Sequence, residues 1–110
     1  MEFEKIKRDI LGKDYSLSIA FISEKKSREI NKKYRNVDKS TNVLSFPFSK
    51  KEGEILLCKS KIRKELKKFG RTFDQLLGFL VIHGMLHLKG MEHGKKMEKA
   101  EEKYLSRTKF

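Results

Sequence analysis

The chain has 110 residues, of which 37% are hydrophobic and 38% are charged. This length allows a modest core and excludes a second domain, so we expect a single domain over residues 1–110. The only cysteine, Cys58, excludes an intramolecular disulfide and any cysteine-based zinc motif. We expect it to be a buried strand thiol.

The start of the chain and its apolar runs bear on location. Met1 to Asp14 mixes charged and apolar residues and lacks the continuous apolar run of a secretory signal. The longest apolar run, Leu76 to Ile82, is too short to span a bilayer. We therefore expect a soluble, cytoplasmic protein with no membrane partner.

Lysine and arginine number 27 against 15 acidic residues, which gives a formal net charge of +12. This excess favours a polyanionic partner such as RNA. The densest cluster lies between Lys59 and Arg71 and could follow a phosphate backbone. The same composition also fits lysines placed on every solvated helix face, so charge alone does not establish the partner.

The first half of the chain predicts a helix, a strand and a second helix. Helical spacing of apolar residues indicates a helix from Phe3 to Leu11 that stops at Gly12. Alternation from Tyr15 to Ile22 indicates a strand, and Ser23 can cap a helix that ends near Tyr34. The strand is expected to have one apolar face, formed by Tyr15, Leu17, Ile19 and Phe21. The second helix is expected to bury little beyond Ile30 and Tyr34. Residues 35–41 read as a loop.

The second half predicts two more strands and three helices. Asn42 to Phe48 is a strand in which Pro47 favours a sheet edge or a strand end. Glu54 to Cys58 is the third strand. Helices are expected from Ser60 to Gly70, from a cap at Thr72 to Leu88, and from about Lys95 to Leu105. The fold class is therefore α+β, a small mixed sheet with three recognisable strands packed against several helices.

Histidine spacing gives the strongest functional signal. His83 and His87 are four residues apart on the predicted central helix, so their imidazoles share a face. Gly90 can adopt a positive φ that reverses the chain and brings His93 back to the same point. Three imidazoles with an open fourth position are typical of catalytic zinc, whose bound water has a pKa near ~7. The sequence predicts one Zn²⁺ on these three histidines.

The spacing HxxxHxxGxxH is also that of the metzincin proteases, in which a glutamate follows the first histidine and acts as general base. Here that position is Gly84. The ligand spacing is retained without the protease's base, which weakens a peptidase interpretation.

These residues resemble the YbeY-type metal-dependent endoribonucleases of bacteria. Their pattern HGxLHLxGYDH appears here as HGMLHLKGMEH, and the resemblance extends to Tyr34-Arg35, to the run from Thr41 to Pro47, and to Gly53-Glu54-Ile55. It also extends to Met97, Glu101 and Leu105 of the last helix. Most of the chain from Tyr15 onward is similar to that family.

The resemblance implies a mixed sheet packed by helices, zinc on His83, His87 and His93, and Arg35 as a functional arginine beside the metal. It also implies single-stranded ribosomal RNA as substrate, in rRNA maturation and ribosome quality control, with the ribosome or ribosome-associated proteins as partners. A guanidinium suits phosphate, which supports Arg35. From the sequence alone, the alternative interpretation of Arg35 is a solvated loop residue.

Three departures from the family pattern stand out. Met91 and Glu92 replace its usual Tyr and Asp, and Glu54 replaces its usual Asp. Glu92 could orient a ligand histidine, serve as a base, or lie exposed to solvent. The chain is also short at its beginning, so we expect the family's first strand to be missing and a sheet edge to be open, which makes dimerisation an option without predicting it.

The sequence thus predicts a zinc-dependent endoribonuclease with catalytic roles for Arg35 and Glu92. Two alternatives stay open at this point. One is a zinc peptidase or amidase, and the other is a non-catalytic RNA- or ribosome-binding protein in which the metal only staples the central helix to the following turn.

Overall fold

The computed structural model describes residues 3–108, so both ends of the predicted 1–110 domain lie outside the described residues. The elements, in chain order, are α1 (Glu4–Leu11), β1 (Ser16–Phe21), α2 (Glu24–Arg35), β2 (Val43–Ser49), β3 (Glu52–Leu57), α3 (Lys59–Lys64), α4 (Leu66–Phe69), α5 (Phe73–Leu88) and α6 (Lys95–Ser106). Among the described residues no helix is both long and apolar enough to cross a lipid bilayer.

The sheet has the strand order β1-β3-β2, with β1 parallel and β2 antiparallel to β3. This confirms the predicted α+β class with a mixed sheet of three strands. β2 is an edge strand and carries Pro47, as expected for a residue that cannot donate to a ladder. The register shifts between Pro47 and Ser49, so the edge is irregular where the strand ends.

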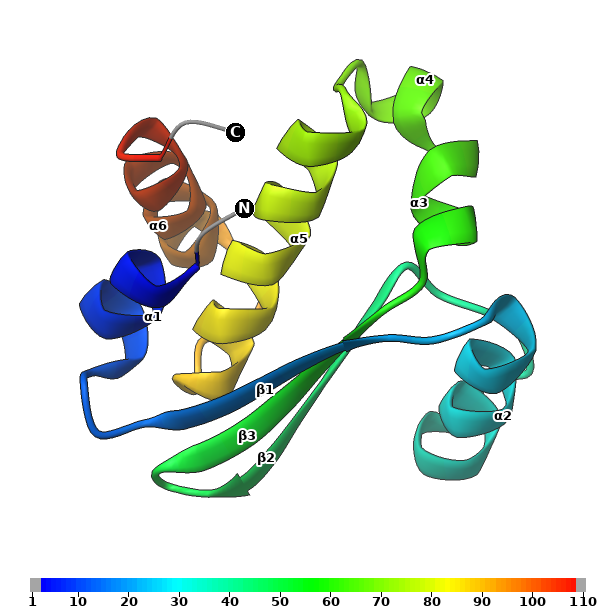
Figure 1. The fold of residues 1–110 in the computed structure, drawn as a ribbon, viewed down its shortest axis with the longest axis horizontal. Helices are drawn as coiled ribbons and strands as arrows, with labels where there is room; N and C mark the ends of the chain where they lie inside the picture. The colour runs from blue at the N-terminus through cyan, green and yellow to red at the C-terminus, as the bar shows by residue number, and fades with distance from the viewer. Residues whose placement is uncertain (1–2, 109–110) are drawn as a thin grey trace.

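The central helix α5 packs on one face of the sheet, and Figure 1 shows α1 and α6 on the same side and α2 on the other. Thr72 begins α5 with a capping box, because its hydroxyl accepts from the Gln75 backbone N–H while the Gln75 side chain accepts from the Thr72 N–H. The helix is apolar almost all round and forms the middle of the core. Gly84 permits its close approach to the sheet, since a Cβ there would lie 3.0 Å from Ile55 Cδ1.

Two predicted burial assignments were wrong. Tyr34 is 63% exposed and Phe21 is 48% exposed. The face that α2 buries is polar: Ser27 Oγ donates to the Thr41 carbonyl and Asn31 Nδ2 donates to the Lys39 carbonyl. The helix therefore holds the following loop through hydrogen bonds, and its aromatic residue stays outside. Cys58 is a buried free thiol, as predicted, but it lies just after β3, at the residue that precedes α3, and not in the strand.

The single basic helix predicted from Ser60 to Gly70 is two short helices, α3 and α4, separated at Glu65. The Glu65 N–H bonds to the Ile62 carbonyl in a tighter turn, and its carboxylate accepts from Asn42 Nδ2 at 3.0 Å. The break between the two helices thus coincides with a contact to a distant loop residue. Gly70, in the left-handed conformation with φ +60°, ends α4 as expected.

Candidate metal centre

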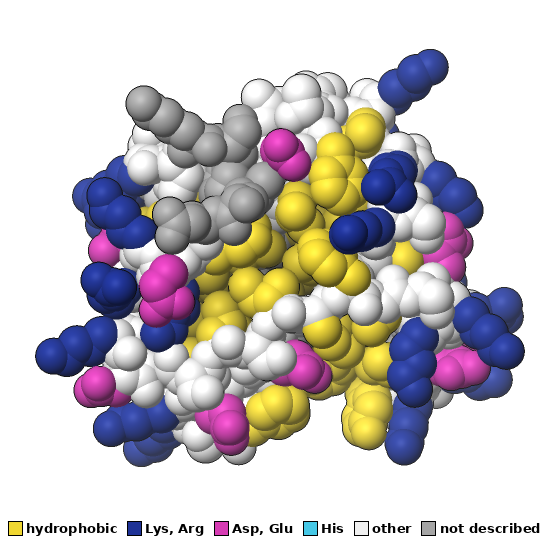
Figure 2. All heavy atoms as spheres, viewed as in Figure 1, with side chains coloured by type: hydrophobic (Ala, Val, Ile, Leu, Met, Phe, Trp, Pro, Cys, Tyr) yellow, Lys and Arg dark blue, Asp and Glu magenta, His cyan; other side chains and the backbone are white. Residues whose placement is uncertain are grey.

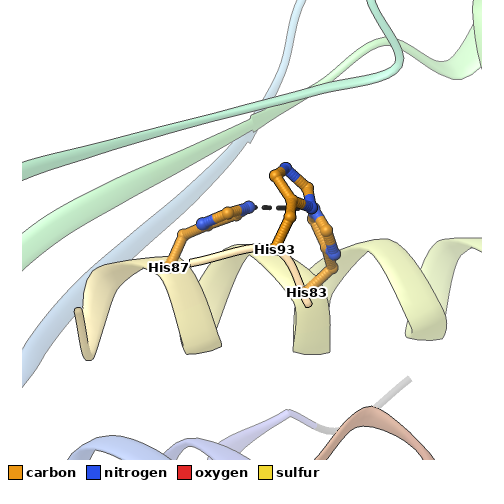
Figure 3. Close-up of side chains that lie close together, drawn as sticks. All are labelled: His83, His87 and His93. Atoms are coloured by element: carbon orange, nitrogen blue, oxygen red, sulfur yellow. Dashed lines mark hydrogen bonds between the residues drawn. The ribbon is translucent and has the colours of Figure 1, made fainter. Parts of the chain in front are cut away.

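Three histidines converge on the side of α5 that faces the sheet. His83 and His87 lie one turn apart on α5, and His93 lies on the loop that leads to α6. One nitrogen from each ring lies within 4.8 Å of the other two. Nε2 of His83 and Nε2 of His87 are 3.0 Å apart, and Figure 3 shows the rings directed toward one another. The structure thus brings together the three ligands expected from the sequence.

The turn after α5 returns His93 to the other two rings. Gly90 has φ +103°, its N–H donates to the His87 carbonyl, and the Met91 N–H donates to the Leu86 carbonyl. These two bonds form a Schellman motif, in which glycine takes the conformation that a side chain disfavours. The chain reversal predicted for Gly90 is therefore present.

Each of the two helical histidines is oriented through its Nδ1 atom. His83 Nδ1 lies 2.9 Å from Glu101 Oε2, and His87 Nδ1 lies 3.1 Å from the Met91 carbonyl. A carboxylate and a carbonyl only accept, so each neutral ring carries its proton on Nδ1 and donates it. Both Nε2 atoms are then left with lone pairs aimed into the cluster.

This arrangement fits a bound cation. The 3.0 Å contact between the two Nε2 atoms, drawn as a hydrogen bond in Figure 3, needs a proton on one of them; with both protons on Nδ1, the two lone pairs repel each other unless a cation lies between them. Two nitrogens held by one zinc at ~2.0–2.1 Å with tetrahedral angles are about 3.3 Å apart, close to the spacing seen here. The partners on Nδ1 are those that commonly orient zinc-binding histidines from behind. The three histidines could therefore hold a metal ion.

The surroundings also favour neutral imidazole, the form that binds metal. Burial lowers the pKa of His87, and the nearby His83 lowers it further. The hydrogen bond to the Met91 carbonyl raises that pKa, and the charge of Arg35 lowers it. A His87 ring that resists protonation remains available as a ligand at neutral pH.

The histidines open into a pocket of about 450 Å³ beneath the edge strand. His83, His87 and His93 form one part of its lining, and Arg35, Ser45 and Pro47 form another. The run from Thr41 to Pro47 thus reaches the metal centre because β2 lies beside α5. A substrate group could approach the metal from this opening.

Arg35 lies at the end of α2 and lines the same pocket as the histidines. Its Nη2 donates to the Ser45 carbonyl at 3.2 Å, which holds an exposed side chain at the pocket wall. Its guanidinium also lies 5.7 Å from the centre of the Phe46 ring. The positively charged guanidinium therefore lies beside the three histidines, where it could contact an anion bound in the pocket.

Glu92 is exposed and does not line this pocket. Within residues 3–108, no hydrogen bond joins it to a histidine. The carboxylate that contacts a histidine is instead that of Glu101. The sequence indicated Glu101 as part of the family resemblance of the last helix, without predicting this contact. Its signal was available, because Glu101 lies between Met97 and Tyr104 on the buried face of a charged helix.

Gly84 occupies the position at which metzincins have their glutamate. A Cβ at Gly84 would lie 3.0 Å from Cδ1 and 3.2 Å from Cγ1 of Ile55, so the sheet leaves no room for a longer side chain. Gly84 itself offers no carboxylate, and a larger residue there would have to displace Ile55, so a metzincin-type base is absent from this position.

Comparisons with known proteins agree with these features. A family profile described as "Endoribonuclease YbeY" matches residues 2–109. A Staphylococcus carnosus protein of that name is 35% identical over 94 residues, which covers 74% of this chain and 61% of the relative. A Thermosipho melanesiensis protein of the same name is 34% identical over 86 residues, which covers 76% and 62%. The chain thus spans about three fifths of the length of these curated relatives.

A solved structure has the same fold. The solution structure of a Thermotoga maritima protein matches with a TM-score of 0.66 at 32% sequence identity, covering 93% of this chain and 76% of the other. Together, the converging histidines, the run along β2 and the profile match identify the family. This chain belongs to the endoribonuclease YbeY family.

Proposed function

We propose that this chain is a zinc-dependent, single-strand-specific endoribonuclease that acts in ribosomal RNA processing and ribosome quality control. One observation carries the proposal: Arg35 and three converging imidazoles line the same pocket. Relatives named endoribonucleases support the reaction class. The proposal treats residues 1–110 as one domain, because α5 contacts the sheet and the flanking helices.

In this proposal His83, His87 and His93 hold one Zn²⁺ per chain through ring nitrogens. Glu101 and the Met91 carbonyl accept from the Nδ1 atoms of His83 and His87, which keeps the ligand nitrogens aimed at one point. A zinc ion bound there would supply Lewis acidity toward a phosphoryl group.

Arg35 binds the phosphate to be cleaved. The Ser45 carbonyl accepts one N–H of the guanidinium, and its other N–H donors, which have no hydrogen-bond partner within residues 3–108, can form charge-assisted bonds with phosphate oxygens. The same cation stabilises negative charge as it develops at phosphorus. Arg35 is therefore a substrate-binding residue whose loss lowers cleavage without removing the metal.

The attacking oxygen is either water or the 2′-hydroxyl of the RNA itself. The general base in this proposal is Glu92, which is exposed and outside the pocket lining and would therefore take up the proton through one bridging water. Attack by the 2′-hydroxyl forms a new O–P bond, breaks the bond to the 5′-oxygen and leaves a 2′,3′-cyclic phosphate. Attack by water leaves no cyclic end, so analysis of the product ends distinguishes the two routes.

The partners proposed are ribosomal RNA and the ribosome or proteins associated with it, which places the reaction in the cytoplasm. Basic residues between Lys59 and Arg71 would add salt-dependent affinity for the phosphate backbone. Figure 2 shows Lys and Arg side chains spread around the edges of one face of the molecule.

The test is cleavage of a ribosomal RNA fragment, single-stranded or annealed to its complement, by zinc-loaded and chelator-treated protein. We expect the zinc-loaded protein to cut the single strand, the duplex to resist, and chelation to abolish cutting until zinc is restored. A panel of peptides is offered in parallel at the same zinc loading. Cleavage of peptides but not RNA would replace the nuclease with a peptidase, and tight RNA binding without cleavage would replace it with a binding protein.

A further inference from the structure

A second hollow lies on the sheet face opposite α5, between α2 and the strands β2 and β3. Its volume is about 580 Å³. We call it the aromatic groove. Its lining includes Lys26, Lys33, Tyr34, Phe46, Phe48 and Glu54. The sequence assigned no role to this surface.

Two of the three rings of the groove are exposed to solvent, and the third, Phe46, is half-buried. Tyr34 is 63% exposed and Phe48 is 61% exposed. Tyr34 and Phe46 pack edge to face with their centres 5.7 Å apart. Neighbouring exposed aromatic side chains on a water-facing surface are typical of binding sites. Here they leave ring faces on which a flat ligand could stack.

Cations lie beside these rings. Lys33 Nζ is 5.3 Å from the centre of the Tyr34 ring, and the Arg35 guanidinium is 5.7 Å from that of Phe46. Lys26 is the second lysine of the lining, and Arg35 lies outside the lining, over the Phe46 ring. Aromatic faces interleaved with basic side chains are the features that bind single-stranded nucleic acid, because the rings stack on bases while the cations attract phosphates.

The groove also contains two carboxylates, Glu29 and Glu54. Glu54 accepts a hydrogen bond from Ser18 Oγ at 3.3 Å. Carboxylates repel a bare polyanion, but they accept hydrogen bonds from the amino groups of bases. The mixed lining therefore suits a nucleotide, which presents both a base and a phosphate, better than a simple anion.

The edge strand β2 separates the groove from the histidine pocket and contributes side chains to both. Along β2, Ser45 and Pro47 line the histidine pocket, whereas Phe46 and Phe48 line the groove on the other face. Arg35 joins the two sites, because it lines the histidine pocket and lies over the Phe46 ring. A flexible strand passing over β2 would meet both sites in succession.

We propose that the aromatic groove is a base-stacking subsite for the nucleotides that flank the phosphate bound at the metal centre. This inference rests on the proposed function and deepens it by naming the part of the substrate that is recognised. Bases in a duplex are already paired and stacked, so only an unpaired strand can place a base on Tyr34 or Phe48. The groove then accounts for selection of single-stranded RNA.

Tyrosine emission gives a direct readout of stacking, because the chain has three tyrosines and no tryptophan. Tyr15 and Tyr104 are buried, which leaves Tyr34 as the exposed fluorophore among the described residues. A short unstructured RNA oligomer is titrated into the full zinc-loaded chain, and the same oligomer made with abasic nucleotides is the control. We expect the intact oligomer to quench the emission and the abasic oligomer to leave it unchanged. Tyr34→Phe should abolish the quench and retain affinity.

Affinity is measured on the same oligomers with a ring-removing variant and matched controls. Phe48→Ala should weaken binding of the intact oligomer at least fivefold and leave abasic binding unchanged, since a stacked base contributes a factor of that size or more. Phe48→Tyr should restore it. The control is Phe21→Ala, which removes an exposed ring from β1, the opposite edge strand. Lys59 Nζ lies 4.3 Å from the centre of that ring, so the control also removes a ring beside a cation, and it should have no effect.

Cleavage of the same oligomer, followed in parallel, separates this inference from the proposed function. Affinity that depends on Phe48, with no cleavage, would retain the subsite and overturn the nuclease. Cleavage with affinity equal in wild type, Phe48→Ala and Phe21→Ala, and with no quench, would retain the nuclease and overturn the subsite. In that case the groove would be a surface for a protein partner.

Discussion

At the scale of single residues, Glu101 links the last helix, α6, to the metal centre through a contact with His83. Its carboxylate contacts His83 Nδ1 at 2.9 Å and both side chains are largely buried. We expect Glu101→Gln to lower zinc affinity about 10- to 100-fold, because an amide orients the ring and increases its basicity less well. The measurement is zinc binding by competition with a chromogenic chelator. Glu102→Gln, an exposed neighbour on α6, is the control.

Equal zinc affinity in Glu101→Gln and Glu102→Gln would contradict the orienting role. The contrast between Glu101 and Glu92 also shows what sequence can predict at this scale. Ligands on one helix and the turn after it follow from local spacing, so all three histidines were predicted. The partner of His83 lies 18 residues away on another helix, and only the packing of α5 against α6 reveals it.

At the scale of elements, the turn at Gly90 decides where His93 lies. No atom outside the turn lies within 4 Å of a Cβ built at Gly90, so a side chain there would act only through the backbone. Gly90→Ala should lower the free energy of unfolding by about 1–2 kcal/mol, because φ +103° is unfavourable for alanine. Zinc affinity should fall with it. Denaturant unfolding and zinc titration measure the two effects.

Gly70→Ala is the matched variant, because Gly70 also has a positive φ and open space around its Cβ. It ends α4, far along the chain from the histidines, so it should lose stability and keep zinc affinity. A loss of zinc affinity equal to that of Gly90→Ala would mean that general destabilisation, and not the turn, sets metal binding.

Helix boundaries were predicted correctly where they depend on residues close together in the sequence. Ser23 and Thr72 cap their helices as predicted, since a side-chain oxygen accepts from a backbone N–H three residues later. The break at Glu65 coincides with a contact to Asn42, and the buried face of α2, opposite Tyr34, bonds to the following loop. Neither contact has a periodic signature, so the sequence predicted one basic helix and a buried tyrosine.

At the scale of the whole molecule, zinc should stabilise the fold, because the three ligands come from α5 and the following loop and are joined to α6 through Glu101. Free zinc at 100 times its Kd adds about 2.7 kcal/mol. For a chain of this size the Tm should rise by on the order of 10 °C. Calorimetry with zinc, and again after chelation, measures the shift. An unchanged Tm would show that the histidines hold no metal in the folded state.

The metal-free fold should be sensitive to acid through His87. Burial, and to a smaller extent the neighbouring His83, lowers the pKa of His87 in the folded chain, so protonation of this ring favours unfolding. The stability from this residue is full above a pH of about 6.5 and is lost as pH falls below that value toward the folded pKa. Without metal, the Tm of the wild type should fall more steeply between about pH 7 and 5 than that of His87→Gln. Parallel curves would contradict the sign of the shift.

The net charge of +12 should appear as salt dependence of RNA binding. Lys67 and Lys68 are exposed on α4, within the basic stretch from Lys59 to Arg71. The double variant Lys67→Gln/Lys68→Gln should reduce the slope of log affinity against log salt by about 1–2. A slope that stays at the wild-type value would exclude this stretch from the RNA contact.

The central claim is that one zinc site and Arg35 together cleave RNA. It is tested most directly by measuring zinc content and cleavage of a single-stranded ribosomal RNA fragment for wild type, His87→Ala and Arg35→Ala in one assay. We predict about one zinc per chain in wild type and Arg35→Ala, loss of zinc in His87→Ala, and loss of cleavage in both variants. Equal residual cleavage in all three proteins, with zinc bound to the wild type, would assign the activity to a contaminant and leave a non-catalytic RNA-binding protein.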